Sequence, residues 1–157
     1  MKRQIISLLC ILFLVSACSG AETVVKKNWV NKENTLVLQD LTPSDLTFKD
    51  SGPALMNALE DSLLAHTSFV LSTDEGQYQL KYKILEYTQG SRGLRLATMG
   101  LLESAKSKLT VKVALYNKGK LVGGWAVESW LKDGLRSEDA LFKEAADDIV
   151  SHLRGGY

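Results

Sequence analysis

Apolar and polar residues alternate along three stretches of the chain, 77–87, 108–116 and 121–131. Because successive side chains of a strand point to opposite faces, this pattern predicts three β-strands that each bury one face. The apolar faces of the first two consist of Tyr78, Leu80, Tyr82, Ile84, Leu109, Val111, Val113 and Leu115. The alternation slips after Ile84, which indicates a β-bulge, and Gly119 lies where a hairpin turn between the last two strands needs a positive φ.

Two other stretches repeat their apolar residues with the period of a helix. From Ser51, a candidate cap, to His66, leucines recur at every fourth position. The second stretch follows Ser137 and stops at Gly155. Its apolar stripe consists of Leu141, Phe142, Ala145, Ala146, Ile149, Val150 and Leu153. With short strands at 35–40 and 68–72, we predict an α+β fold: a mainly antiparallel sheet of about five strands with two helices packed on one face, in the order β-α-β-β-β-β-α.

The N-terminal 17 residues have the pattern of a secretory signal. Lys2 and Arg3 precede an apolar run over 5–15, which is shorter than the roughly 20 residues that a membrane-spanning helix needs. The sequence Val15-Ser16-Ala17-Cys18 then resembles the lipobox of bacterial lipoproteins. That resemblance implies a diacylglyceryl group on Cys18 and cleavage before it. An ordinary signal peptide with an incidental cysteine is the alternative.

The lipobox resemblance also implies a location. Enterobacterial lipoproteins that stay at the inner membrane carry Asp after the lipidated cysteine, whereas this chain has Ser19. We therefore expect outer-membrane sorting, a signal peptide over 1–17, a polar tether over 18–34 and one periplasmic domain over 35–157. Trp29 in the tether would pack on the domain or rest at the membrane interface. The chain of 157 residues is long enough for one domain with its own core.

Charge and cysteine content exclude several classes of function. The net charge of +1 becomes −1 if Lys2 and Arg3 leave with the signal, which argues against a general nucleic-acid binder. The two cysteines are Cys10 and Cys18, both in the signal region. The mature domain would therefore have no thiol for a disulfide, a zinc site or a nucleophile.

The sequence carries no recognisable catalytic or metal-binding motif. His66 and His152 lie near predicted helix ends, where a histidine usually contacts terminal carbonyls. Asp147 and Asp148 are adjacent on a helix, so their side chains point about 100° apart and do not form a carboxylate pair. We expect no metal, no cofactor and no enzymatic activity; a glycan-active or lipid-active envelope enzyme is the alternative.

The connection between the first two long strands carries a more specific pattern. Gly90, Arg92, Arg95 and Gly100 form a G-x-R-x-x-R segment followed by small residues, then a hairpin and a last helix with Ala-Ala-Asp-Asp-Ile-Val from Ala145. This layout resembles a family of uncharacterised proteobacterial lipoproteins, domain-of-unknown-function family four-four-one-zero. The loop after Gly100 departs from that family, because it is not rich in glycine. The layout is more distantly similar to periplasmic domains of curli-secretion and penicillin-binding-protein-activator lipoproteins, which bind other envelope proteins.

This connection has two interpretations. In the first, its apolar residues cap the open end of the core and both arginines are solvated; these apolar residues are Leu94, Leu96, Met99, Leu101 and Leu102. In the second, Arg92, Leu94, Arg95, Met99 and Leu101 belong to a contact surface for an envelope protein or an anionic envelope surface, with Lys106 and Lys108 beside it. We therefore expect an outer-membrane lipoprotein, anchored through Cys18, whose domain binds or scaffolds another envelope component. A subunit of a secretion or surface-assembly complex is the alternative.

Overall fold

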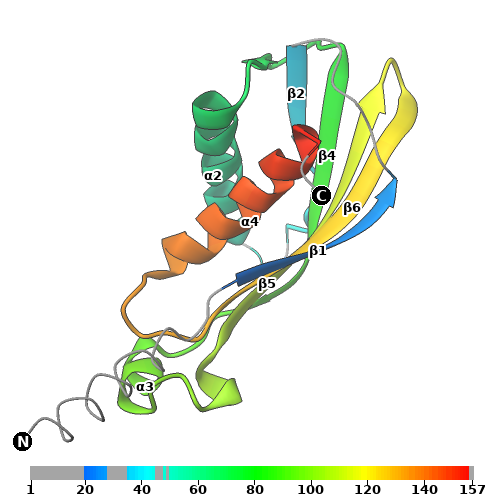
Figure 1. Ribbon diagram of the computed structural model, residues 1–157. Coiled ribbons are helices and arrows are strands. Elements are labelled where there is room, and N and C mark those ends of the chain that lie inside the picture. Colours follow the sequence, from blue (N-terminus) through cyan, green and yellow to red (C-terminus); the bar gives the residue numbers. More distant parts are fainter. Residues whose placement is uncertain (1–19, 28–34, 45–47, 49, 156–157) are drawn as a thin grey trace, which may run out of the picture.

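The computed structural model describes residues 20–27, 35–44, 48 and 50–155 (Figure 1). Its strands are β1 (Gly20–Lys27), β2 (Thr35–Asp40), β3 (Val70–Leu71), β4 (Tyr78–Thr88), β5 (Ser107–Asn117) and β6 (Lys120–Leu131). The helices are α2 (Ser51–His66), α3 (Arg92–Ala97), the 3₁₀ helix η2 (Glu103–Ala105) and α4 (Glu138–Leu153). The signal segment 1–17, Cys18 and Trp29 lie outside the described residues.

The strands form one sheet in the order β1-β6-β5-β4-β2-β3. Neighbours from β1 to β4 are antiparallel, whereas β2 pairs in parallel with both β4 and β3. A parallel pair needs a long connection that returns the chain to the starting end, and α2 provides it between β2 and β4. The predicted α+β class, with a mostly antiparallel sheet and two long helices on one face, is confirmed (Figure 1).

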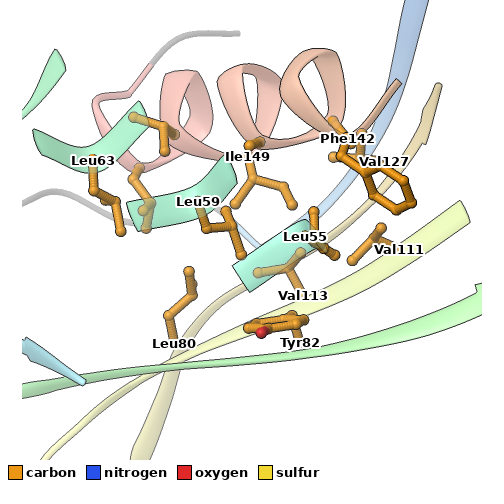
Figure 2. Packing of buried hydrophobic residues seen from close by; sticks show 14 of the residues in the cluster. Leu55, Leu59, Leu63, Leu80, Tyr82, Val111, Val113, Val127, Phe142 and Ile149 are labelled. Carbon is orange, nitrogen blue, oxygen red and sulfur yellow. The ribbon is translucent and has the colours of Figure 1, made fainter. Parts of the chain in front are cut away.

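The core lies between the helices and one face of the sheet. Leu55, Leu59 and Leu63 of α2 are buried, as are all seven predicted residues of the α4 stripe. They pack against the predicted apolar faces of β4 and β5, every residue of which is buried. Figure 2 shows Leu59 and Ile149 of the two helices above Leu80, Tyr82 and Val113 of the sheet. The Ser62 hydroxyl of α2 donates to Asp147 of α4 over 2.8 Å, which joins the two helices directly.

Local details agree with most of the sequence prediction. The register of β4 and β5 shifts between Ile84 and Glu86, at the predicted bulge, and Gly119 has a φ of 79° in the hairpin turn. The cap at Ser51 is wrong: this residue is the first of α2, and its hydroxyl donates to the Phe48 carbonyl instead of accepting an amide. The strand predicted over 68–72 is reduced to Val70–Leu71.

The main departure from prediction is at the N-terminal edge of the sheet. The segment 18–34 was expected to be a tether, but its residues 20–27 form β1, which pairs antiparallel with β6 from Gly20 opposite Trp130 to Lys27 opposite Gly124. The free edge of β6 explains the difference, because its backbone amides and carbonyls need partners and a neighbouring strand provides them. The described part of the sheet therefore includes Gly20, which follows Cys18 by two positions in the sequence.

Candidate contact surface

The connection between β4 and β5 folds into two short helices at one end of the sheet. Ser91 precedes α3, and its hydroxyl accepts the Leu94 amide over 3.3 Å, as an N-cap does. Met99 and Gly100 then turn the chain with φ of 51° and 76°. The helix η2 returns the chain to β5. Figure 1 shows α3 beyond the end of the strands, away from the hairpin turn between β5 and β6.

Arg95 holds this connection against the domain. Its side chain is 1% exposed. The guanidinium donates through Nε to the Asp133 carbonyl over 2.9 Å, and through Nη1 to the Ser107 hydroxyl over 2.6 Å and to Glu138 over 3.0 Å. The Ser107 hydroxyl in turn donates to the same Glu138 oxygen over 2.7 Å. Arg95 thus ties α3 to the start of β5, the loop after β6 and the first turn of α4.

Arg92 and two glycines add further attachments. The guanidinium of Arg92 donates to the Gly134 and Leu135 carbonyls, each over 3.1 Å. A Cβ atom on Gly90 would overlap the Ala105 carbonyl, and one on Gly100 would lie 2.5 Å from the Lys132 carbonyl oxygen. Each of the four residues that carry the family resemblance therefore has a structural role at this end of the domain, as a hydrogen-bond donor or as a position where two backbones approach closely.

Six large apolar side chains at this end remain exposed to solvent. They are Leu94, Leu96, Met99, Leu101, Leu102 and Leu135, and we call this set the apolar end. Met99, Leu101 and Leu135 are 73%, 85% and 79% exposed. A cluster of this kind on a domain that has a complete core elsewhere usually marks an interaction site.

These positions decide between the two interpretations of the connection. The core-cap interpretation is wrong, because its five apolar residues are exposed and its two arginines are bound to the protein. Leu94, Met99 and Leu101 are available for contact, as the second interpretation requires. Its placement of Arg95 on the contact surface is wrong, since a buried guanidinium cannot reach a partner. Arg92 is exposed but binds carbonyls of the loop after β6.

The basic residues around the apolar end have partners within the chain. Lys106 and Lys132 each lie 3.7 Å from Glu103, and the Lys106 ammonium lies 5.4 Å from the centroid of the Trp130 ring. Lys108 lies between Glu86 and Glu128, at 3.2 and 3.3 Å, and hydrogen bonding to Glu86 raises its pKa. The surface at this end is therefore mainly apolar, because its three lysines are paired with glutamates of the same chain.

The loop after β6 is itself fixed by an acidic residue. Asp133 accepts the Leu135 and Arg136 amides and pairs with the Arg136 guanidinium at 2.9 Å. Burial alone would raise the pKa of Asp133, but the hydrogen bonds from Arg136 outweigh it and the pKa is lowered. Arg136 also reaches Glu144 of α4. Asp133 therefore stays ionised at neutral pH, and its hydrogen bonds hold the loop that carries Leu135.

Sequence reasoning missed Leu135, Ser107, Gly134 and Glu138 as parts of this end. Ser107 and Glu138 are 12 and 43 residues from Arg95, and no motif spacing connects them. Glu138 lies in the first turn of α4. The sole signal in the sequence is Leu135, an isolated apolar residue in an otherwise polar loop.

The other candidate residues lie elsewhere. His152 contacts the Asp148 carbonyl within α4 at 2.9 Å and stacks on Trp125, and Asp147 accepts from Ser62 and Lys143. Among the described residues, no group of three or more His, Cys, Asp or Glu side chains has a metal-binding arrangement. A groove of about 690 Å³ runs between α2 and α4, with Ala54, Ala58 and Asp61 in its lining. Within the same described ranges, no helix is both long and apolar enough to span a bilayer.

Comparison with known proteins identifies the fold but no family. The architecture, a sheet with two helices on one face, recurs in solved structures of low sequence identity. One is a PelC dodecamer from Paraburkholderia phytofirmans, with a TM-score of 0.57 at 12% identity over 85% of this chain and 97% of that one. Another is the hypothetical protein CT253 from Chlamydia trachomatis, with a TM-score of 0.56 at 9% identity over 78% and 97%. No family model and no curated protein matches the chain.

Proposed function

We propose that this protein is a lipoprotein, anchored in the outer membrane through Cys18, whose periplasmic domain contacts another component of the cell envelope through the apolar end. The observation that carries the proposal is the exposure of Leu94, Met99 and Leu101 on a segment that Arg95 fixes from within. Exposed apolar side chains are unfavourable in water, and here the ion pair between Arg95 and Glu138 keeps their segment in place. Their exposure therefore indicates a binding surface, because it does not help the domain to fold.

The lipobox resemblance supports the anchor, and β1 supports a close connection between anchor and domain. Because Gly20 is already paired in the sheet and Ser19 alone separates it from Cys18, the lipid would hold the domain close to the membrane. The domain would remain at the membrane surface, and its partner in the envelope would therefore also lie at or near that surface.

A specific observation favours a second candidate, a subunit of a multi-copy envelope assembly. The PelC structure of similar fold is a dodecamer, and β1 leaves one of its own edges unpaired among the described residues. An open edge of eight residues is a surface on which another strand can pair. In this alternative, copies of the chain would contact one another through the sheet edge while the apolar end remains available.

Photo-crosslinking in cells tests the proposed contact. A photoreactive amino acid replaces Leu101 in one variant and Lys83, an exposed residue of β4, in a matched control. We expect a discrete adduct at position 101, with an envelope protein or with lipid, and none at position 83. Adducts of equal yield at both positions, or none at position 101, would show that the apolar end has no dedicated partner.

A further inference from the structure

The position of β1 determines which end of the domain lies nearest the lipid. Gly20 pairs with Trp130, one residue before the end of β6, and Leu131 pairs with Ser107 at the start of β5. The anchored strand therefore begins at the end of the sheet from which the apolar end projects. Figure 1 shows β1, drawn in dark blue, beginning toward the end of the sheet where α3 lies.

The covalent chain limits how far Cys18 can lie from this end. Two residues of extended chain span at most about 7 Å, so the Cα atom of Cys18 lies within about 7 Å of that of Gly20. The same limit applies to the Cα atoms of Trp130 and Lys132. A Cβ on Gly100 would lie 2.5 Å from the Lys132 carbonyl oxygen, so α3 and its turn contact the loop after β6 directly. Along this path, Cys18 is within roughly 25 Å of the apolar end.

The opposite end of the domain is much farther away. Trp130 lies near the end of β6, which spans the 12 residues Lys120–Leu131, and the hairpin turn at Gly119 precedes the start of that strand. At about 3.3 Å per residue, the turn lies more than 30 Å from the point where Gly20 is paired. Leu121, also exposed, is at that far end and provides an internal reference.

We infer that the apolar end rests in the bilayer leaflet that holds the acyl chains of Cys18; this inference rests on the lipid anchor proposed above. The domain then contacts the membrane at two places, the lipid and the surface of Met99, Leu101 and Leu135. The partner of the contact surface is the lipid itself. Two attachments hold a protein at a bilayer more firmly than one and also fix its orientation.

The charges near the apolar end indicate how it would bind. Arg95, Lys106 and Lys132 all have acidic partners within the chain. Arg92 is exposed and donates to the Gly134 and Leu135 carbonyls, so one cation at this end is left to attract anionic headgroups. Trp130, beside Lys106, lies at the level where the anchored strand begins, and tryptophan is enriched at the membrane interface. Insertion would therefore depend on apolar contact with acyl chains, with weak dependence on lipid charge.

The test measures the depth of a fluorescent label in vesicles that carry the acylated, full mature protein. Cys18 is blocked by its lipid and Cys10 leaves with the signal, so Leu101→Cys and Leu121→Cys each provide one reactive thiol. Met99→Cys is a second probe of the apolar end. The vesicles contain phosphatidylcholine, with or without phosphatidylglycerol, and lipids with a nitroxide placed either near the headgroup or near the chain end.

We expect labels at positions 101 and 99 to shift their emission to shorter wavelength and to be quenched most strongly by the shallow nitroxide, in both lipid mixtures. The label at 121 should keep its emission in water. A label at 101 that remains in water would overturn the inference. A label that is shielded from water but unaffected by lipid nitroxides would also overturn it, since another copy of the chain would then cover the apolar end. The lipid anchor is tested by two separate measurements, the mass of the purified protein and its flotation with vesicles. A protein that lacks the mass of the acyl chains and does not float with vesicles would contradict the proposed function itself.

Discussion

Arg95 of α3 and Glu138 of α4 form an ion pair of 3.0 Å between positions 43 residues apart in the sequence. It joins the connection between β4 and β5 to the helix layer and closes the end of the domain where β5 begins. The arginine that looked like a surface ligand is therefore the internal support of the surface. What it supports is the apolar end, whose side chains remain in solvent.

Removal of the Arg95 side chain should destabilise the domain. We expect Arg95→Ala to lower the free energy of unfolding by roughly 3 kcal/mol, the lower end of the range for a broken buried ion pair, because Glu138 keeps some contact with water. Chemical denaturation measures the change. Arg92→Ala is the matched control: its exposed side chain makes two hydrogen bonds to carbonyls, and a loss of about 1 kcal/mol is expected. Equal losses for both variants would contradict the role assigned to Arg95.

Gly100 and Gly119 have similar φ angles, 76° and 79°, but different surroundings. A Cβ at Gly100 would lie 2.5 Å from the Lys132 carbonyl oxygen, whereas a Cβ at Gly119 would meet nothing within 4 Å. Both alanine variants carry the left-handed penalty of roughly 1–2 kcal/mol. Gly100→Ala should therefore lower the thermal midpoint clearly more than Gly119→Ala. If the two midpoints fall equally, the close approach of α3 to the loop after β6 is not present.

The packing of α2 is tested by two leucines on its opposite faces. Leu59 is fully buried and Leu64 is 69% exposed. Leu59→Ala should lower the free energy of unfolding by roughly 2–5 kcal/mol as a core truncation. Leu64→Ala should change it by less than about 0.5 kcal/mol. An unchanged thermal midpoint for Leu59→Ala would mean that the helix buries another face.

Acid should weaken the loop that supports Leu135. Burial opposes ionisation of Asp133, but its hydrogen bonds with Arg136 and Leu135 lower its pKa below the ordinary value of 3.8. A group with a depressed pKa stabilises the folded state above its unfolded pKa, and that stabilisation is lost as the pH falls through the folded value. Asp133→Asn should therefore be less stable than wild type near neutral pH, with the difference shrinking as the pH falls below 3.8. A difference that is constant over this range would exclude the ionised carboxylate as its source.

Most of the fold follows from periodicity, because α2, α4 and the three long strands each bury one regular face. The sequence could not predict β1: Val24 and Val25 are adjacent, polar residues surround them, and the strand forms because β6 offers an open edge. The parallel pairing of β2 with β4 was also unpredicted, since both parallel and antiparallel partners suit a strand as short as β2.

The candidate site was predictable in part. The apolar composition of the connection pointed to Leu94, Met99 and Leu101, which are exposed. The burial of Arg95 could not be foreseen, because its partners Ser107 and Glu138 come from β5 and α4 and the fold alone brings them together. An arginine in a glycine-rich loop is ordinarily expected in solvent.

We propose that a lipid on Cys18 holds the domain at the membrane, and metabolic labelling with a radioactive fatty acid is the direct test of that anchor. Wild type and Cys18→Ala are expressed in parallel, and each membrane fraction is examined for labelled protein. If Cys18 carries the lipid, the wild type alone takes up the label and the variant is released from the membrane fraction. A Cys18→Ala variant that stays in that fraction and still incorporates the fatty acid would contradict the anchor.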